Sequence, residues 1–393
     1  MRVLVAHNRY SSRVPSGENL AVDDEVRWLR AAGVDVVVHE VSNDDAVDPG
    51  PLARVRQAGD AVWSLPARRR FLADLDAVRP DIVHVHNLFP LLSASVPAAA
   101  HRRDVPVAWT VHNRRVRCVA GGYFRDGAPC HQCRPGWRAP GVVHRCYAGS
   151  AAASTLVTAS SSLFLARARR GDVTPIAPSR FMAAWLTSAA GLDPASVQVK
   201  YNGVARAPAG EVTAGLPADR RVFLFAGRLA AYKGVRLLLD AWRHADLDAE
   251  LHILGDGDLA PEVEAAAAHD DRITWVGSVE PERVGTALAA ARTVVVPSLW
   301  DEPFGRVAAE ALAHGRPVIT TGRGGLAEIV DDTVGWITGD APVALAGALA
   351  AAMDDAAVAH RAAAARRRHA DRFSPEATTA ALVALYERLA RRR

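Results

Sequence analysis

Two glutamates, Glu302 and Glu310, lie eight positions apart in a stretch with an apolar run, a polar loop and a helix-like segment. The apolar run at 294–297 is expected to be a buried strand, and a helix is expected to begin near Gly305. Backbone N–H groups at Phe304 and Gly305 would then lie at the helix start, where negative charge is favoured. This arrangement suits a ligand that combines hydroxyls with negative charge, and a nucleotide sugar is such a ligand.

The same glutamates could instead act as a general acid and a general base. If one helix covered both, eight positions would separate them by about 12 Å along its axis. Retaining glycosidases, whose two carboxylates flank one bond, need about 5 Å. The spacing therefore favours two carboxylates that hold different ends of a long ligand. A second alternative pairs Glu310 with Arg306, one turn earlier on the helix surface.

Two cations follow another expected strand, at 221–226. The strand leads into Gly227, and Arg228 and Lys233 lie in the turn before the next helix. An arginine fork and a compact ammonium group suit a diphosphate. The chain contains only two lysines, Lys200 and Lys233, so arginine is its default cation. A lysine in this turn therefore favours a function, although a solvated surface charge is the alternative.

Histidines follow two expected strands in the first half of the chain. The strand at 81–86 ends in His86, and the strand at 105–111 is followed by His112. In parallel sheets, ligands gather at the carboxyl ends of the strands. Either histidine could be a loop residue bonded to a backbone carbonyl, but two at neighbouring strand ends favour a site, more so for His112.

The four cysteines lie in a stretch rich in glycine, proline and arginine, at Cys118, Cys130, Cys133 and Cys146. Four thiolates can close a tetrahedral zinc site, which would organise a segment with little apolar surface to bury. Unligated thiols and a redox or disulfide role are the alternatives. A zinc ion here would be structural, because four thiolates leave no open position for catalysis.

Apolar strands alternate with helices along most of the chain, which predicts an α/β fold with parallel sheets covered on both faces. The stretch at 43–59 is expected to be a loop. The other expected strands are 3–7, 34–38, 173–177, 197–201, 250–254, 272–276, 317–320 and 335–338. The expected helices are 18–32, 67–78, 150–170, 180–190, 234–244, 259–268, 281–291, 342–353, 356–372 and 375–392.

The stretch at 205–219 is rich in proline, glycine and alanine and is the best domain boundary in the chain. We expect a doubly wound domain at 1–205, with a cysteine-rich insertion at 114–149. A second doubly wound domain is expected at 206–374, followed by an amphipathic helix at 375–393. Two such domains would leave a cleft between their strand ends, where both could hold one ligand.

The formal net charge of +4 is small for 393 residues and gives no case for nucleic-acid binding. The apolar run near the N-terminus is too short for a signal peptide, and no uncharged apolar run of membrane-spanning length follows. We expect a cytoplasmic protein with, at most, peripheral contact at the inner membrane face.

The segment from Glu302 to Glu310 resembles the E-x7-E signature of retaining glycosyltransferases of family 4. Four further motifs resemble that family in the same order: Ala226-Gly227-Arg228-Leu229 with Lys233-Gly234, Leu254-Gly255-Asp256-Gly257, Val296-Pro297-Ser298 and His314-Gly315-Arg316-Pro317-Val318. The resemblance covers nearly the whole chain. It implies a GT-B fold, in which two Rossmann-like domains face each other across a cleft and a C-terminal helix returns to the first domain.

The resemblance also implies roles for individual residues. The first domain would bind mainly the acceptor, and the second domain the nucleotide sugar. Arg228 and Lys233 would hold the diphosphate, Glu310 the ribose hydroxyls and Glu302 the hydroxyls of the donor sugar. Further donor contacts are expected at Gly227, Gly277, Pro303, Phe304 and Gly305.

In the first domain, the resemblance places His112 near the transferred sugar and Gly17 in a loop that faces the phosphates. That loop reads Pro15-Ser16-Gly17-Glu18, where the family often has two adjacent glycines. The expected catalytic residues are therefore His112, Glu302, Arg228 and Lys233.

The implied reaction moves a hexose-type sugar from a UDP- or GDP-sugar to a hydroxyl acceptor with retention and without a catalytic metal. The acceptor would be a saccharide, a lipid-linked saccharide or a natural product. No carboxylate is evident as a covalent nucleophile, which favours attack on the same face as the leaving group. The alternatives are a nucleotide-sugar-binding protein without turnover and a nicotinamide-dependent oxidoreductase, whose glycine fingerprint is missing here.

Overall fold

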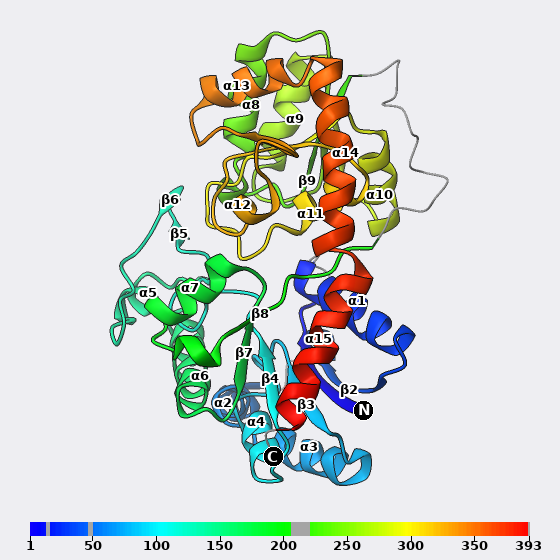
Figure 1. Ribbon diagram of the computed structural model, residues 1–393. Coiled ribbons are helices and arrows are strands. Elements are labelled where there is room, and N and C mark those ends of the chain that lie inside the picture. Colours follow the sequence, from blue (N-terminus) through cyan, green and yellow to red (C-terminus); the bar gives the residue numbers. More distant parts are fainter. Residues whose placement is uncertain (13–15, 46–49, 206–220, 392–393) are drawn as a thin grey trace. The chain divides into compact units, whose positions relative to one another are not determined.

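A computed structural model of the chain describes residues 1–12, 16–45, 50–205 and 221–391, with the side chains of 50–55 left out. The described residues form two compact units (Figure 1). The first unit comprises Met1–Tyr123, Cys130–Gly203 and Thr378–Arg393, and the second comprises Phe124–Pro129 and Val204–Ala377. The predicted linker lies almost entirely outside the described residues, and the predicted domain limits stay predictions.

The first unit is built on a six-stranded parallel sheet with the strand order β2-β1-β3-β4-β7-β8. Its strands are β1 (Arg2–Arg9), β2 (Asp35–Ser42), β3 (Ile82–Val85), β4 (Val107–Thr110), β7 (Thr174–Ala177) and β8 (Gln198–Val199). Its helical segments are α1 (Gly17–Ala31), η1 (Asn43–Asp45), α2 (Gly50–Val62), α3 (Leu65–Val78), α4 (Ser95–His101), α5 (Ala139–Val143), α6 (Ala151–Arg170), α7 (Arg180–Ser188), η2 (Pro194–Ser196) and most of α15 (Pro375–Ala390).

Both faces of this sheet are buried. Successive side chains of a strand point to opposite faces, so a strand with buried side chains at every position is covered on both sides. In β1, Val3 and Val5 pack in one apolar cluster, whereas Leu4 and Ala6 pack in the other. The cluster of Val3 also contains residues of α1 and the C-terminal α15, including Leu382. The expected return of the C-terminal helix to the first domain is therefore confirmed.

The second unit repeats this plan with the strand order β11-β10-β9-β12-β13-β14, again all parallel. Its strands are β9 (Val222–Ala226), β10 (Glu250–Leu254), β11 (Ile273–Gly277), β12 (Thr293–Val296), β13 (Val318–Thr320) and β14 (Gly335–Ile337). Its helical segments are η3 (Ala231–Lys233), α8 (Val235–Ala245), α9 (Ala260–His269), α10 (Pro281–Ala290), α11 (Arg306–Ala313), α12 (Leu326–Ile329), α13 (Pro342–Ala351) and α14 (Asp355–Arg372).

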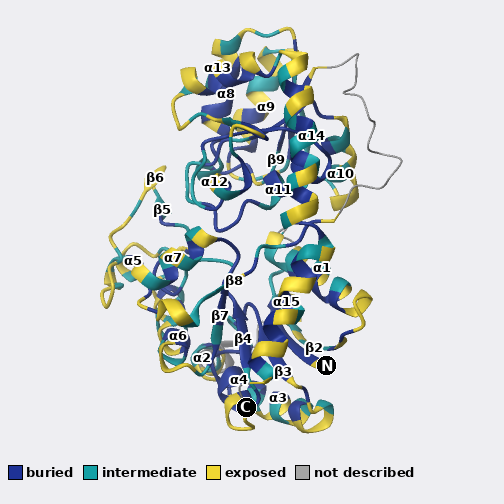
Figure 2. Cartoon of the chain, viewed as in Figure 1, coloured by how far each residue is buried: buried dark blue, intermediate teal, exposed yellow. Residues whose placement is uncertain are grey.

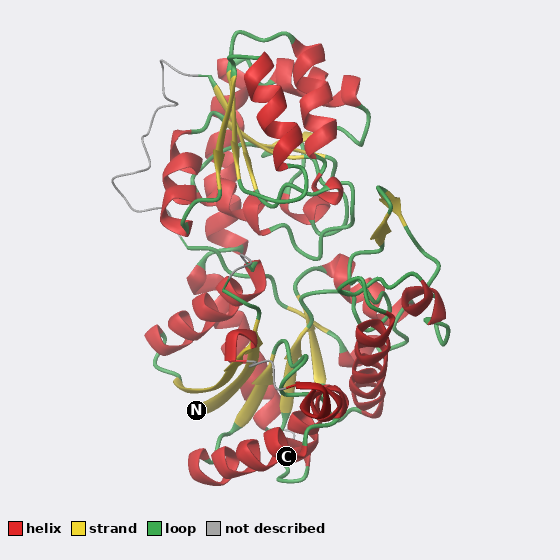
Figure 3. Ribbon diagram, turned by 180° about the vertical axis from the view of Figure 1, so that it is seen from behind, coloured by secondary structure: helices red, strands yellow, loops and turns green. Residues whose placement is uncertain are grey.

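The strands of each unit lie in its interior with helices around them (Figure 3), and the exposed residues are mostly on the outer faces of the helices (Figure 2). A short antiparallel hairpin, β5 (Phe124–Arg125) with β6 (Ala128–Pro129), belongs to the second unit. One prediction is corrected, because the stretch predicted as a loop at 43–59 contains η1 and most of α2. The short helices α4, α5 and α12 and the β5–β6 hairpin were not predicted.

The missed helix α2 shows tertiary packing overriding local propensity. Gly50 and Gly59 lower the helix propensity of this stretch, whereas Pro51 lies in the first turn of α2, where proline is tolerated. The helix nevertheless packs against α6. Packing of this kind supplies most helix stability in proteins, which a local reading of the sequence does not include.

Among the described residues, no single helix is long and apolar enough to cross a membrane. Among them, α13 and the stretch Asp355–Ala390 are long and apolar enough only when taken together, and they are bent by 93° at their junction.

Candidate functional site

The turn after β9 holds Arg228 through backbone contacts. The amide of Gly227 donates to the backbone carbonyl of Leu254 at 3.0 Å, and that of Leu229 to the backbone carbonyl of Asp256 at 2.9 Å. Gly255 is required here, because it adopts a φ of +132° and a Cβ would lie 1.9 Å from the carbonyl oxygen of Gly227. Arg228 itself is exposed. The turn is therefore a rigid platform that presents a guanidinium group to solvent.

Lys233 and Glu302, predicted separately, are in direct contact. The Nζ atom of Lys233 donates to Oε1 of Glu302 at 2.7 Å, and the hydroxyl of Ser298 donates to the same oxygen at 2.8 Å. The ammonium group also lies 5.4 Å from the ring centroid of Trp300. The Glu302 side chain is 8% exposed and that of Lys233 is 25% exposed, so the lysine side chain is partly open to solvent.

The residues before α11 are packed against a glycine turn. A Cβ on Gly324 would lie 2.5 Å from the carbonyl oxygen of Glu302, and one on Gly325 would lie 2.8 Å from that of Phe304. Gly305 is the N-cap of α11 with a φ of +106°. This close backbone packing fixes the start of α11, and Pro303 and Phe304 are buried in it.

Glu310 lies on the second turn of α11, whereas Glu302 precedes the helix. Its Oε1 atom accepts from Nε of Arg306 at 2.7 Å. The alternative helix-surface pair is therefore present in the structure. The two side chains are 21% and 19% exposed, so a ligand can still reach Glu310.

Gly277 ends β11, and its carbonyl accepts from the amide of Gly255 at 2.7 Å. Gly277 thus lies at the carboxyl end of β11, and Gly227 directly follows β9. The loops after β9 and β12 carry Lys233 and Glu302, so all four residues are on the side of the sheet where the strands end. The sequence analysis named Ser298 only as part of a motif, without a role, and assigned no role to Trp300, although both lie in the polar loop directly after β12.

In the first unit, His112 follows β4 and lines a pocket together with His86, Trp109, Arg115 and Phe164. Burial lowers the pKa of His112 to about 3. The imidazole is therefore neutral near pH 7. In this state it offers one nitrogen as a donor and one as an acceptor.

Gly17 is the first residue of α1 and is exposed. A Cβ on it would meet nothing within 4 Å, so the packing of the described residues does not explain why this position is glycine. Residues 13–15 lie outside the described chain. The predicted phosphate contact of Gly17 stays a prediction.

A buried polar network beside His112 was not predicted. Glu25 of α1 lies against His84 of β3, His86 and Lys200, and the network reaches Tyr386 of α15. His86 and Lys200 follow the ends of β3 and β8. Sequence reasoning singled out both, but did not predict that a glutamate joins them.

The four cysteines are free thiols, and Cys118 is buried. The amide of Tyr123 donates to Sγ of Cys118 at 3.3 Å, and Cys133 accepts backbone hydrogen bonds from Val119 and Gly141. Burial, with the nearby Cys118 thiol, raises the pKa of Cys133. Among the described residues, no three of these sulfur atoms lie within 4.8 Å of one another.

Comparison with known proteins identifies the class. Residues 16–207 match the family described as Glycosyltransferase Family 4, and residues 220–355 match Glycosyl transferases group 1. The D-inositol 3-phosphate glycosyltransferase of Xylanimonas cellulosilytica is 32% identical over 324 residues, which are 80% of this chain and 73% of that relative.

Solved structures agree over the full length. Sucrose-phosphate synthase from Thermosynechococcus elongatus superimposes with a TM-score of 0.69 at 21% identity and covers 100% of both chains. Anabaena HepE, solved in complex with UDP-glucose, has a TM-score of 0.69 at 17% identity and covers 98% of this chain and 99% of its own.

The fold is that of the GT-B glycosyltransferases, and the protein is a glycosyltransferase. Within that class, the chain belongs to glycosyltransferase family 4. This assignment removes the nicotinamide-dependent alternative.

Proposed function

We propose that this glycosyltransferase moves a hexose-type sugar from a UDP- or GDP-sugar to a hydroxyl acceptor with retention of configuration. The observation that carries the proposal is the Lys233–Glu302 pair. It combines a cation for a diphosphate with a carboxylate for sugar hydroxyls in one direct contact. The UDP and UDP-glucose complexes of Anabaena HepE, a protein of the same fold, support a nucleotide-sugar donor.

Each group has a separate part in binding the donor. The guanidinium of Arg228 and the ammonium of Lys233 bind the diphosphate, and the start of α11 adds backbone N–H groups. Glu302 accepts hydrogen bonds from the sugar hydroxyls, and Glu310 from the ribose. When ribose binds, Glu310 turns from Arg306 or shares its oxygens with both partners.

The transfer step needs charge stabilisation more than acid–base residues. The bond between the sugar C1 and the phosphate oxygen breaks, and a new bond from C1 to the acceptor oxygen forms on the same face. The acceptor's hydroxyl proton passes to the leaving phosphate oxygen. Arg228 and Lys233 stabilise the charge that develops on the diphosphate, so the step requires no metal ion.

Thermal shift with UDP-, GDP- and dTDP-sugars tests the donor assignment. A ligand that binds only the folded state stabilises it by RT ln(1 + [L]/Kd), so a bound donor raises the Tm in a concentration-dependent way. We expect a shift with a UDP- or GDP-sugar in the presence of EDTA, and none with NAD. A shift that requires a divalent metal, or none with any sugar nucleotide, would contradict the proposal.

We propose separately that the four cysteines hold one structural zinc ion. The backbone N–H groups directed at Cys118 and Cys133 suit thiolate sulfur, although the sulfurs would have to move closer together to share one ion. Metal analysis of the purified chain should find about one zinc per chain, lost in Cys130→Ser. A chain without zinc that folds normally would contradict this assignment. The cytoplasmic location stays a prediction from the sequence.

A further inference from the structure

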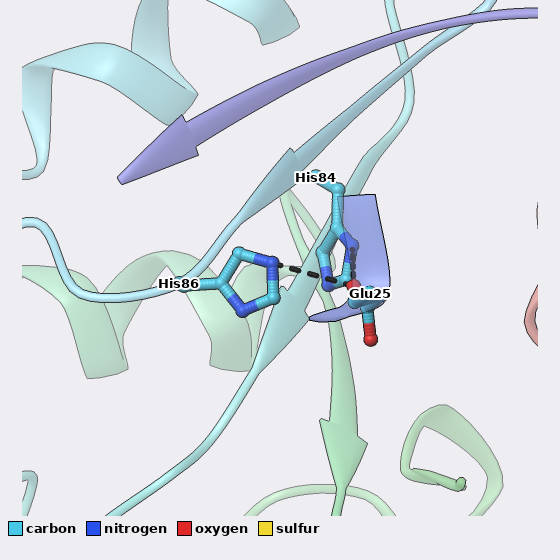
Figure 4. A group of neighbouring side chains, drawn as sticks. All are labelled: Glu25, His84 and His86. Atoms are coloured by element: carbon cyan, nitrogen blue, oxygen red, sulfur yellow. Dashed lines mark ion pairs between the residues drawn. The ribbon is translucent and has the colours of Figure 1, made fainter. Parts of the chain in front are cut away.

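His86 lies between a buried carboxylate and the candidate site residue His112. Nδ1 of His86 is 3.0 Å from Nε2 of His112, and the two rings are inclined by only 25° with centroids 5.3 Å apart, as expected for rings that meet edge to edge through these nitrogens. On its other side, Nε2 of His86 is 3.5 Å from Oε1 of Glu25 (Figure 4). The residues come from three elements: Glu25 from α1, His86 from the end of β3 and His112 from the end of β4.

Glu25 is held in its charged form. Burial alone would raise its pKa, but the Lys200 ammonium and His84 hold the pKa well below its usual range. Nζ of Lys200 lies 2.5 Å from one carboxylate oxygen, and Nδ1 of His84 lies 3.1 Å from the other. A buried carboxylate paired in this way can only accept hydrogen bonds.

The spacing of Glu25, His84 and His86 would also suit a metal ion, since their ligand atoms all lie within 4.8 Å of one another. Two contacts argue against that use. Lys200 already places a positive charge on the carboxylate, and the hydroxyl of Tyr386 lies 2.6 Å from Nδ1 of His84. The group is therefore a buried polar cluster whose cation is a lysine.

These contacts determine which ring nitrogen carries the proton in His86 and in His112. Burial, with His84 nearby, lowers the pKa of His86, so this ring is neutral and has a single N–H. Nε2 of His86 and Oε1 of Glu25 are too far apart, at 3.5 Å, for a normal hydrogen bond, and neither atom has another hydrogen-bond partner among the described residues. A lone pair on Nε2 would face the negative charge of the carboxylate and be repelled, whereas an N–H is attracted, so the proton belongs on Nε2 of His86. Its Nδ1 must then accept, and the partner that the described residues give it is Nε2 of His112, which therefore carries the proton.

We propose that Glu25 and His86 are positioning residues that fix His112 in the Nε2–H tautomer and leave its Nδ1 as a hydrogen-bond acceptor for substrate. This inference rests on the proposed function and adds a restriction on the substrate. The group that meets Nδ1 of His112 must be a donor, such as a sugar or acceptor hydroxyl. A phosphate oxygen would face a lone pair there and be repelled.

The tautomer can be measured without any substrate. In protein labelled with 15N-histidine, long-range 1H–15N correlation separates protonated from unprotonated ring nitrogens, and His112→Gln identifies the signals of His112. We expect a neutral His112 near pH 7 with its proton on Nε2. A proton on Nδ1, or a cationic ring, would overturn the inference and leave the thermal-shift result untouched.

Two substitutions of His86 distinguish positioning from simple packing. In His86→Asn the amide oxygen is as many bonds from Cβ as Nδ1 is, so it can still accept from His112, and the tautomer should be retained. His86→Leu removes the acceptor, and His112 should become a mixture of tautomers. His252→Leu, in β10 of the second unit, is the control and should leave the His112 signals unchanged.

Turnover supplies an independent readout. Hydrolysis of UDP-glucose without acceptor should fall about ten- to hundredfold in His86→Leu, the range found for residues that orient metal-bound histidines, and recover at least partly in His86→Asn. Equal loss in both variants, with the His112 tautomer unchanged in both, would show that His86 acts only through packing. If UDP-glucose is not a substrate, the NMR comparison still decides the inference.

Discussion

The two lysines of the chain each pair with a glutamate, one pair in each unit, but in different surroundings. The Lys200 and Glu25 side chains are 6% and 9% exposed, so the pair is closed off from solvent. Lys233 is 25% exposed while its partner Glu302 is 8% exposed. The first pair is occupied within the fold, whereas the ammonium of the second can exchange part of its contact for a ligand.

This difference separates two uses of the same chemistry. A buried pair costs much desolvation, and removing one partner leaves an uncompensated charge. A pair that reaches solvent adds little stability, but holds a cation in place for an anionic ligand. Lys200 should therefore matter for stability, and Lys233 for donor binding.

The largest expected effect is on stability, from Lys200→Met. Glu25 would stay buried without its cation, so we expect a loss of about 3–5 kcal/mol in the free energy of unfolding, measured in urea. The double variant Glu25→Leu with Lys200→Met should lose much less, because no charge is left unpaired. A loss below about 1 kcal/mol in the single variant would show that the buried Lys200–Glu25 pair does not matter for stability in the way described.

Lys233→Met should change stability little and donor binding strongly. We expect a stability change of about 1 kcal/mol. The affinity for the UDP- or GDP-sugar should fall about ten- to hundredfold, because a charge-assisted hydrogen bond to the diphosphate is lost. Arg243→Met, which removes an exposed cation of α8, is the matched control and should change neither quantity. Unchanged donor affinity in Lys233→Met would mean that this pair is also structural.

Glu302 and Glu310 should divide the donor between them. Glu302→Gln should reduce turnover and the preference for the sugar nucleotide over the free nucleoside diphosphate. Glu310→Gln should weaken the free nucleotide about two- to tenfold, because it loses hydrogen bonds to the ribose. Calorimetry with UDP and UDP-glucose measures both. If Arg306→Gln reproduced the Glu310→Gln result, the ion pair itself rather than a ribose contact would be responsible.

The first unit's network should also make the stability depend on pH. The pKa of His86 is lowered in the folded state by burial, so below about pH 6.5 the unfolded state binds more protons. Stability should therefore fall as the pH drops from 6.5, by at most about 1.4 kcal/mol per pH unit for this histidine. His86→Asn should have a shallower slope between pH 6.5 and 5 in urea unfolding. An equal slope would remove His86 as a cause.

The sequence was sufficient for the features that depend on local pattern. Continuous apolar runs predicted the strands of both sheets, and glycines at strand ends predicted the turn that carries Arg228. The contacts between side chains were harder. The Lys200–Glu25 pair joins residues 175 positions apart, and nothing in the local sequence indicates which buried groups will meet.

In the candidate site, too, local features were predicted and contacts between distant side chains were not. Lys233 and Glu302 were predicted as ligands of a donor, but their direct contact and the Ser298 hydrogen bond depend on how β9 and β12 lie in the sheet. The Arg306–Glu310 pair was foreseen as an alternative because an i,i+4 pair is local. The helix α2 was missed because its stability comes from a distant partner.

One measurement tests the central claim most directly: titration calorimetry of UDP- and GDP-sugars, in EDTA, against the wild type, Lys233→Met and Arg243→Met. We predict binding of at least one of these donors to the wild type and to Arg243→Met, and binding weakened about ten- to hundredfold in Lys233→Met. Absence of binding to the wild type, or equal affinity in all three proteins, would contradict the account.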